Sequence, residues 1–400
     1  MTYLPNRLPA HGQPLDPRDA AILGPEGAAR IARVLALREN GGATPLIALP
    51  GLAAELGIGA LHLKDEGQRL GLGSFKALGG AYALMMLVLE EASQRLGREV
   101  AVEELFSDEV KAVAATMTFA CATDGNHGRS VAQGAQLMGA RSVIFVHGGV
   151  SQNRADAIAA YGAEIRWVDG TYDESIVESA RVSEAEGWTI VSDTSWDDYE
   201  VIPGLVMQGY VALIAESLAA LDTPPTHVFL QAGVGGFAAA VAGHLALVLG
   251  DGRPCAIVTE PARAACLYES AKQGRVAKVG EDEPTVMAML ECYEPSPLAF
   301  RVLERCADGF LTVPEEAATE VMRRLAAPVA GDPAVVAGES GGAGLAGLVT
   351  LLRDAEGAKA AGLGPQSRVL VINTEGATDA ALYERIVGKT PAEVVAEVAA

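Results

Sequence analysis

Short apolar runs alternate with longer amphipathic segments along almost the whole chain. The apolar runs have the length and the β-branched content of buried strands, and they lie at 60–66, 113–120, 142–147, 163–169, 189–193, 227–231, 255–260, 309–314 and 368–374. Between most of them, apolar residues recur at helical spacing, as at 129–139, 152–162, 174–187 and 205–221. Alternating strands and helices predict crossover connections, and therefore an α/β fold with mainly parallel sheets.

Length and charge narrow the class of protein. The chain has 400 residues, which is more than one compact core usually holds, so we expect two domains or one large α/β body. Thirty basic against fifty-one acidic side chains give a net charge of −21. This balance argues against nucleic acid and anionic membranes as partners.

Two stretches bear on localisation. The first 19 residues carry prolines and charges where a signal peptide would carry its apolar core. Residues 228–250 are almost uncharged, like a membrane-spanning helix, but they begin with a strand-like "HVFLQ" pattern and contain three glycines in a short loop. We interpret that stretch as a strand, a glycine loop and a buried helix, and we predict a cytoplasmic protein.

The loops at strand ends are the places to look for a site, because parallel sheets bind ligands at the carboxyl ends of their strands. In "CATDGNHGRS" (121–130), two glycines flank Asn126 and His127, and Asp124 precedes them. Backbone N–H groups where a helix begins can hold a carboxylate. Taken alone, however, the loop is better explained as an ordinary turn with a helix cap.

A second loop, "AGVGGFAAA" (232–240), allows two interpretations. Gly233, Gly235 and Gly236 let the backbone curl around a phosphate. With Ala238 the same glycines also fit the G-x-G-x-x-A pattern of dinucleotide sites, and Glu260 ends the next strand, where a ribose-binding acid would lie. An NAD-dependent oxidoreductase therefore remains open on this loop alone, although it gives Lys76 and the Asn126 loop no role.

Lys76 stands in "LGLGSFKALGG" (70–80), at the start of an apolar helical run. A helix N-terminus disfavours a cation, so this lysine is either solvated or present for chemistry. Thr374 and Asp193 also follow strands, where each side chain either caps a helix or faces a pocket. The glycine-rich segment 338–348 is interpreted as close helix packing.

Taken in order, several segments resemble one known family. They are "KDEGQRLGLGSFKALGGAYA", "TDGNHGRSVA", "SDTSWDDYEVIPGLVMQGY", "QAGVGGFAAA", "EPARAACLYES", "VMAMLECYEPSPL" and "NTEGATD". This set is similar to the fold type II (tryptophan synthase β-like) pyridoxal-phosphate enzymes, and within them to the diaminopropionate ammonia-lyases. The similar segments span roughly residues 45 to 380. "SFKALGG" indicates the superfamily, and "TDGNHGR" together with "SDTSWDDY" is more selective.

The resemblance implies an architecture and a cofactor. It implies two interleaved domains, each with a mainly parallel sheet flanked by helices: a large cofactor-binding domain made of residues 1–84 and 201–400, and a small domain made of residues 85–200. It also implies pyridoxal 5'-phosphate as the cofactor, a small amino acid as the substrate and a homodimer. No residue pattern indicates a metal.

The resemblance also assigns roles to residues. Lys76 matches the Schiff-base lysine, and Thr374 matches the hydroxyl partner of the pyridine nitrogen. Asn126 matches the residue that contacts the ring oxygen. The loop that binds the phosphate matches Gly233, Val234, Gly235, Gly236 and Phe237. The amides expected to hold the substrate carboxylate belong to Thr123, Asp124, Gly125, Asn126 and His127.

The implied reaction is α,β-elimination of 2,3-diaminopropionate, in both D and L forms, to pyruvate and ammonia. Lys76 and Asp124 would act as bases on opposite faces of the substrate, and Asp193 would pair with the β-ammonium group. The alternative is a pyridoxal-phosphate-dependent dehydratase of a β-hydroxy amino acid such as serine, threonine or hydroxyaspartate. Cys266 and Cys292 lie in family-like segments and could approach each other, but in a cytoplasmic chain we expect reduced thiols.

Overall fold

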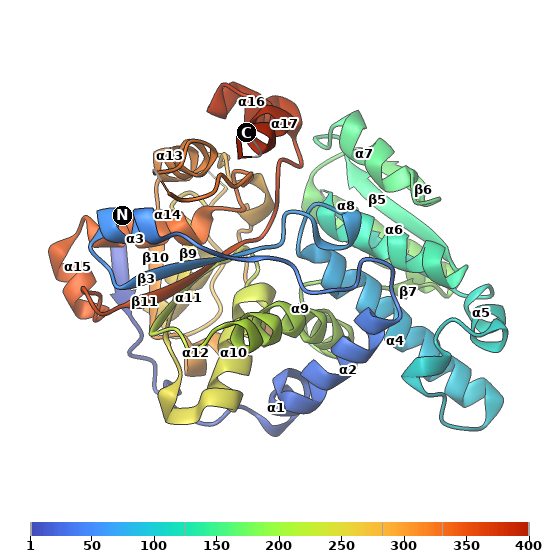
Figure 1. Cartoon of the computed structure of the whole chain (residues 1–400). Coiled ribbons are helices and arrows are strands. Elements are labelled where there is room, and N and C mark those ends of the chain that lie inside the picture. Colours follow the sequence, from blue (N-terminus) through green and yellow to red (C-terminus); the bar gives the residue numbers. More distant parts are fainter. Residues whose placement is uncertain (1, 124, 282, 330, 399–400) are drawn as a thin grey trace.

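The computed structural model describes residues 2–123, 125–281, 283–329 and 331–398. The chain forms two β-sheets with helices around them (Figure 1). The larger sheet has seven strands in the order β1-β10-β9-β8-β11-β3-β2. Their bounds are Thr2–Pro5 (β1), Leu46–Ala48 (β2), Ala60–Asp65 (β3), His227–Gln231 (β8), Cys255–Pro261 (β9), Gly309–Val313 (β10) and Arg368–Asn373 (β11).

The smaller sheet has four strands, in the order β6-β5-β4-β7, and all its pairs are parallel. Helices α6 and α8 pack against its strands. The elements of this part are α5 (Asp108–Ala114), β4 (Thr118–Ala122), α6 (Asn126–Met138), β5 (Arg141–His147), α7 (Gln152–Ala159), β6 (Glu164–Val168), α8 (Tyr172–Glu186) and β7 (Thr189–Ile190).

Helices cover the larger sheet on both faces (Figure 1). Its five inner strands are mutually parallel, and only the edge strands β1 and β2 pair antiparallel. The remaining helices are α1 (Pro17–Leu23), α2 (Pro25–Ala36), α3 (Pro50–Leu56), α4 (Lys76–Leu96), α9 (Val201–Ala220), α10 (Gly236–Leu249), α11 (Cys266–Gln273), α12 (Pro297–Cys306), α13 (Glu315–Ala326), α14 (Ala343–Leu352), α15 (Ala355–Ala360), α16 (Ala380–Val387) and α17 (Pro391–Val398).

Successive residues of the inner strands enter two different hydrophobic cores. In β8, Val228 and Leu230 pack into the core that also holds α4, α9 and α10, whereas Phe229 packs into the core beneath α13 and α14. Side chains of a strand alternate between faces, so a sheet covered on both sides needs apolar residues at every position. For this reason the inner strands appear in the sequence as almost uninterrupted apolar runs.

The predicted α/β fold with mainly parallel sheets is confirmed, with local differences. The strand predicted at 113–120 is wrong at its start, because α5 extends to Ala114 and β4 begins only at Thr118. Ser107 caps α5, with its hydroxyl accepting from Val110 N at 3.4 Å, and two acidic residues occupy the first turn. The short edge strands β1 and β2 were missed.

The predicted domain boundaries stay a proposal. The division at 200/201 coincides with the beginning of α9, but the one at 84/85 falls inside α4. Helix α4 packs against α6 beside the smaller sheet and also against α9 beside the larger one. It therefore joins the two parts instead of separating them.

One helix in the described part of the chain, α9, is long and apolar enough to cross a membrane. Of its most apolar window, 67% is buried inside the protein, and the helix packs against α2, α4 and α10. It is therefore a core helix of this fold. The stretch 228–250 forms β8, a glycine loop and α10, as predicted.

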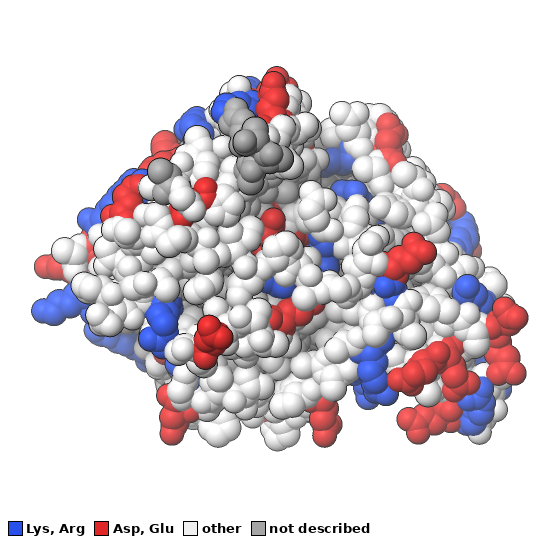
Figure 2. Space-filling model, in the orientation of Figure 1, with Lys and Arg blue, Asp and Glu red and all other residues white. Residues whose placement is uncertain are grey.

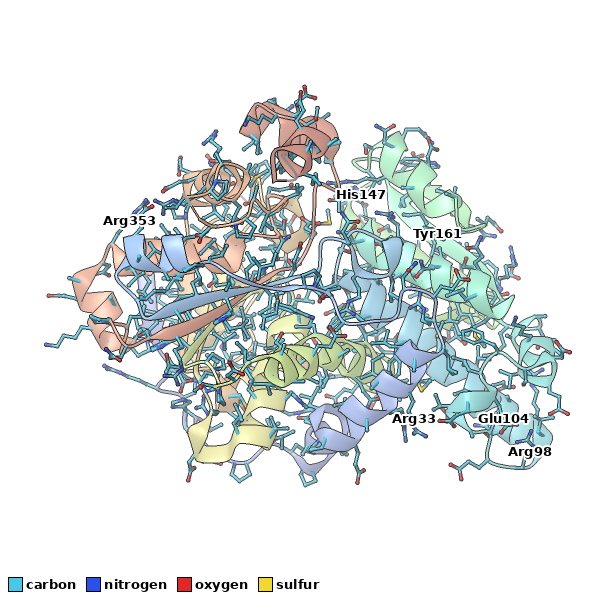
Figure 3. The ribbon with its side chains drawn as sticks, in the orientation of Figure 1. Arg33, Arg98, Glu104, His147, Tyr161 and Arg353 are labelled. Carbon is cyan, nitrogen blue, oxygen red and sulfur yellow. The ribbon has the colours of Figure 1, made fainter. Side chains whose placement is uncertain are left out.

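Charges lie mainly at the periphery of the face drawn in Figure 2, where acidic and basic side chains are interspersed. Near α5, for example, Arg98 Nη2 lies 2.7 Å from Glu104 Oε2 in an exposed ion pair (Figure 3). Such exposed pairs contribute little to stability, because solvent screens their charges.

Close contact between α4 and α9 depends on glycine at position 209. A Cβ atom there would lie 2.2 Å from the carbonyl oxygen of Leu78. We therefore expect Gly209→Ala to lower the free energy of unfolding by about 1–3 kcal/mol, as overpacking does. Urea unfolding measures this, with Gly252→Ala as control because a Cβ at Gly252 meets nothing within 4 Å. Equal midpoints for the two variants would contradict the packing argument.

Candidate active site

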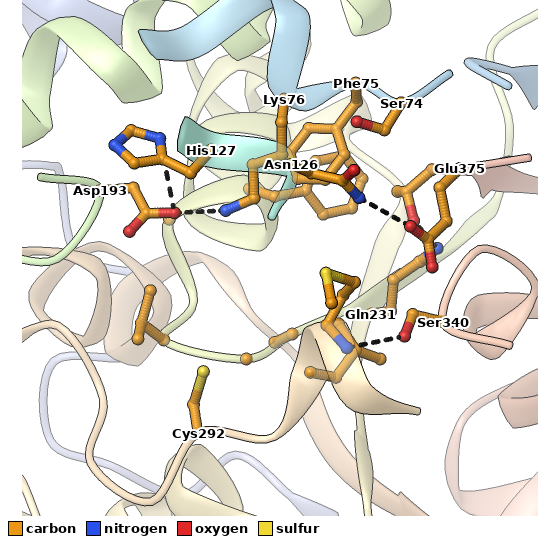
Figure 4. A pocket seen from close by; sticks show the side chains of 18 of the residues that line it. Ser74, Phe75, Lys76, Asn126, His127, Asp193, Gln231, Cys292, Ser340 and Glu375 are labelled. Atoms are coloured by element: carbon orange, nitrogen blue, oxygen red, sulfur yellow. Dashed lines mark hydrogen bonds and ion pairs between the residues drawn. The ribbon is translucent and has the colours of Figure 1, made fainter. Parts of the chain in front are cut away.

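One pocket lies between the two sheets, where loops leave the carboxyl ends of β4, β7, β8 and β11 and where α4 begins (Figure 4). The structure brings together the predicted site residues that it describes. They are Lys76, Thr123, Gly125, Asn126, His127, Asp193, Gly233, Val234, Gly235, Gly236, Phe237 and Thr374. Asp124 lies outside the described residues.

Backbone hydrogen bonds fix the loop that carries Lys76. Phe75 N donates to Thr374 O at 2.9 Å, and Gly376 N donates to Gly73 O at 3.0 Å. The ring of Phe75 lies 4.7 Å from that of Tyr210 and 4.9 Å from that of Phe237, centroid to centroid. Lys76 therefore begins α4 from a segment that is tied to the end of β11.

A buried network of ion pairs fixes the segment that precedes the Lys76 loop. The guanidinium of Arg69, fully buried, lies 2.7 Å from Glu66 and 2.6 Å from Glu216 of α9. Lys64 Nζ lies 2.5 Å from the same Glu216 oxygen. Removing one partner of such a cluster leaves an uncompensated buried charge, so the cluster constrains the conformation of residues 64–69. This network was not predicted from the sequence.

Lys76 and Asp193 form an ion pair across the pocket. Lys76 Nζ donates to Asp193 Oδ2, and both side chains are partly buried. Burial by itself would lower the pKa of Lys76, but the Asp193 carboxylate outweighs it and the pKa is raised overall. For Asp193 burial acts in the opposite sense, and the Lys76 ammonium outweighs it and holds the pKa of Asp193 well below the usual range. The pair is therefore charged on both sides.

His127 stands beside this pair. Its Nε2 lies 2.8 Å from Val191 O, and because a carbonyl only accepts, Nε2 carries the proton. Burial lowers the pKa of His127, so the ring is neutral and Nδ1 is an acceptor. Nδ1 lies 3.9 Å from Asp193 Oδ2, which is thus between the imidazole and Lys76 Nζ (Figure 4).

The Thr123 side chain organises the turn before α6. Gly125 has φ +159°, and the Thr123 hydroxyl accepts from Gly125 N at 3.1 Å and from Gly128 N at 3.2 Å. Helix α6 begins at Asn126, so its first amides have no partner within the helix and its dipole favours an anion. The arrangement suits a carboxylate.

The glycine loop after β8 presents a second helix N-terminus to the pocket. Gly235 has φ +100°, in the left-handed region, and a Cβ there would lie 3.0 Å from Leu267 Cδ1. Helix α10 begins at Gly236, and the bond from Ala239 N to Gly235 O is 2.9 Å long. The amides before Ala239 lie within reach of an anion such as a phosphate.

Gln231 and Ser340 also line the pocket, and neither was predicted from the sequence. Gln231 Nε2 lies within hydrogen-bond distance of three acceptors, Gly341 O at 2.7 Å, Ile372 O at 2.9 Å and Thr374 Oγ1 at 3.0 Å, which share its two hydrogens. Where Thr374 Oγ1 accepts from Gln231, the Thr374 hydroxyl still has its own hydrogen to donate. Gln231 ends β8, so the strand-end rule could have found it. Segment 338–348 does more than pack a helix, since Ser340 faces the site.

Glu260 does not occupy a ribose-binding position. It is completely buried, and its carboxyl group accepts from Leu267 N at 2.8 Å and from Tyr268 N at 2.7 Å at the start of α11. Burial raises its pKa to about 8. Glu260 is therefore a cap of α11, and the dinucleotide interpretation loses the acid that it requires.

The five cysteines form no disulfide in this structure. Cys266 Sγ lies 3.7 Å from Gly233 O, and Cys292 lines the pocket. Among the residues that the structure describes, no group of three or more His, Cys, Asp or Glu side chains is arranged to hold a metal ion.

Residues 37–375 match the profile of the family described as "Pyridoxal-phosphate dependent enzyme". The chain belongs to this family. It is 40% identical over 352 residues to diaminopropionate ammonia-lyase of Escherichia coli K12, covering 86% of this chain and 87% of that one.

Two crystal structures of the E. coli diaminopropionate ammonia-lyase match this pyridoxal-phosphate enzyme, each with a TM-score of 0.86, 35% identity and 96% of both chains covered. One is a complex with D-serine, and the other holds an aminoacrylate-PLP azomethine reaction intermediate. The fold type II architecture of the chain follows from this likeness, and the NAD-dependent alternative is wrong.

The pocket fits pyridoxal phosphate by the chemistry of its groups. Ser74 Oγ, Tyr210 OH and His127 Nδ1 are buried lining atoms without a hydrogen-bond partner among the described residues. A primary amine, a helix N-terminus and a hydroxyl donor accompany them at Lys76, Gly236 and Thr374. Lining atoms left unpaired in this way indicate a polar ligand, since buried polar groups are normally hydrogen-bonded.

Substituting Gly235 tests the phosphate loop. We expect Gly235→Ala to weaken pyridoxal-phosphate binding by about tenfold or more, because φ +100° strains any other residue and the Cβ crowds Leu267. Titrating the apoprotein with cofactor and following absorbance gives the Kd. Gly274→Ala is the matched control, a left-handed glycine (φ +70°) at the end of α11. If both variants bind alike, Gly235 has no special part in binding.

Proposed function

We propose that this chain is a pyridoxal-phosphate-dependent ammonia-lyase that converts 2,3-diaminopropionate, in both D and L forms, to pyruvate and two molecules of ammonia. The observation that carries the proposal is the Asp193 carboxylate facing the lysine in the pocket of a chain 40% identical to a diaminopropionate ammonia-lyase. A carboxylate in this place suits a substrate with a second ammonium group.

The proposed cofactor contacts use groups that the pocket already presents. Lys76 would hold the cofactor covalently, the amides from Gly233 to Phe237 would bind its phosphate, and the Thr374 hydroxyl would donate to its ring nitrogen. When bound, pyridoxal phosphate supplies the electron sink that makes the α-proton of an amino acid acidic. Of the amides expected to hold the substrate carboxylate, from Thr123 to His127, Thr123 N donates to Phe145 O at 3.1 Å and Gly125 N to the Thr123 hydroxyl. The carboxylate would therefore lie at the start of α6, on the amides of Asn126 and His127.

Asp193 would select the leaving group. Its carboxylate can pair with the β-ammonium of diaminopropionate once Lys76 is engaged elsewhere. A β-hydroxyl group would leave this buried charge without its ionic partner, which disfavours serine. His127 Nδ1, an acceptor beside Asp193, would help to orient the same ammonium.

Proton removal from the α-carbon would need one base for each stereoisomer. Lys76 suits one face. Asp124, whose place we infer from the family resemblance alone, suits the other. A neutral hydroxyl at Thr374, in place of an acid, would leave the ring nitrogen unprotonated and favour prompt elimination.

Assays with D- and L-diaminopropionate and with D- and L-serine test the proposed function directly. We expect one pyruvate for every two ammonia from diaminopropionate, and much slower release from serine. Faster turnover of a β-hydroxy amino acid would support a dehydratase instead, the alternative suggested by the D-serine complex of the E. coli enzyme.

We expect Asp193→Asn to lower kcat/KM for diaminopropionate by about 10- to 100-fold, because a charge-assisted hydrogen bond worth about 1.5–3 kcal/mol is lost. The value for serine should change less, so the ratio between the two substrates should fall. Asp198→Asn is the control: Asp198 is exposed in the same segment, and its φ of +65° is one that asparagine tolerates. An unchanged substrate ratio in Asp193→Asn would remove Asp193 from selectivity.

The two-base assignment predicts an asymmetric effect at position 124. Asp124→Asn should reduce kcat/KM for one enantiomer of diaminopropionate by at least about 100-fold, the lower range for a general base, and should spare the other. Stopped assays on the separate enantiomers measure this. Equal losses on both would refute the assignment.

A further inference from the structure

A hydrogen bond inside the pocket joins the two sheets, and the proposed function does not use it. Asn126, the first residue of α6 beside the smaller sheet, donates from Nδ2 to Glu375 Oε2 at 2.8 Å (Figure 4). Glu375 follows β11 of the larger sheet, one residue after Thr374. Asn126 is 9% exposed and Glu375 2% exposed, so water does not compete for this bond.

Glu375 is itself held in place. Gly338 N donates to its carbonyl oxygen at 3.0 Å, and Ser74 forms a β-bridge with it. The Thr378 hydroxyl donates to Oε2 at 3.2 Å, so Oε2 accepts from two donors. Oε1 is buried and has no hydrogen-bond partner in the described part of the chain. The carbonyl oxygen of a protonated carboxyl group would thus be Oε2, with the proton on Oε1.

The surroundings of Glu375 favour its neutral form. Burial and then the nearby Glu339 raise the pKa of Glu375 to about 8, although the hydrogen bonds from Asn126 and Thr378 lower it. Glu339 is buried as well, and burial raises its own pKa. Arg154 of α7 is the cation that acts in the opposite sense on both groups. At neutral pH the Glu375 side chain is therefore a carboxylic acid.

We propose that Glu375 is a positioning residue that, as a neutral acid, holds the Asn126 carboxamide with its NH₂ group toward the ring oxygen of the cofactor. This inference rests on the proposed function and on the contact with the cofactor's ring oxygen that the family resemblance implies for Asn126. It adds Glu375 to the residues that orient the cofactor, and the family resemblance assigned Glu375 no role.

The reason lies in the symmetry of an amide. A half-turn of the Asn126 side chain exchanges its NH₂ group and its carbonyl oxygen, which have almost the same shape. With Oε2 of Glu375 as an acceptor, one N–H is used there and the second remains for an acceptor in the pocket. Without that acceptor the carbonyl could turn to the ring oxygen, where two acceptors would repel. A neutral Glu375 side chain also adds no negative charge beside the cofactor ring, which has to accept electrons.

Two substitutions separate orientation from mere space-filling. Glu375→Leu removes the acceptor, and we expect a Kd for pyridoxal phosphate about tenfold higher, as for one lost hydrogen bond, with a shifted visible band. Glu375→Gln keeps an acceptor oxygen and resembles the protonated acid, so it should retain the wild-type Kd and band at neutral pH. Wild-type binding and spectrum in Glu375→Leu would overturn the proposal.

A pH series on the apoprotein tests the neutral form and does not depend on Glu375→Leu folding. A carboxyl whose pKa is about 8 in the folded state and 4.5 in the unfolded state binds more protons when folded. Its contribution to stability is therefore lost as pH rises through that interval. Between about pH 6 and pH 8, the wild-type urea midpoint should fall more steeply than that of Glu375→Gln. Parallel curves would overturn the proposal.

The variant Glu339→Gln extends this series. Removing the Glu339 carboxyl should lower the pKa of Glu375, so the urea midpoint of this variant should begin to fall at a lower pH than that of the wild type.

None of these measurements uses an amino acid substrate. If the wild-type protein fails to release ammonia from diaminopropionate while the variants behave as expected, the proposed function fails and the role of Glu375 stands. If ammonia is released and Glu375→Leu binds the cofactor normally, the role of Glu375 fails alone.

Discussion

The rest of the site depends on a single ion pair, between Lys76 at the start of α4 and Asp193 after β7. Both the dipole of α4 and burial disfavour a cation at this place, and the opposing carboxylate reverses that balance. Because α4 begins beside the larger sheet and Asp193 follows a strand of the smaller one, the charges can meet only where the two sheets face each other. The pocket therefore lies at that junction.

A second contact crosses the same junction, and further hydrogen bonds and ion pairs fix the residues on each side of it. Asn126 reaches Glu375 from the opposite sheet, while the imidazole of His127 is fixed by Val191 next to β7. On the larger-sheet side, the bond from Phe75 N to Thr374 O and the buried network around Arg69 fix the segment that leads to Lys76. Backbone hydrogen bonds and buried charges thus fix the segment that carries the Lys76 amine.

Much of this site could be predicted, because parallel strands bring the loops at their carboxyl ends together. Lys76, Asn126, the loop from Gly233 to Phe237 and Thr374 follow from that rule together with glycine and helix-start patterns, and their family resemblance supplied the cofactor. Partnerships between distant side chains leave no periodic signal. Gln231 and Glu375 were missed for this reason, although each stands at or just after a strand end. The true start of β4 was missed because the cap at Ser107 competes with an apolar run that suits either structure.

The most direct test is to reduce the protein with borohydride in the presence of pyridoxal phosphate and to map the modified peptide by mass spectrometry. Borohydride makes the link between a lysine and this cofactor permanent. We expect a single pyridoxyl group on Lys76, and none in a Lys76→Ala variant. A pyridoxyl group on another lysine in the wild-type protein, or no modification with saturating cofactor, would contradict it.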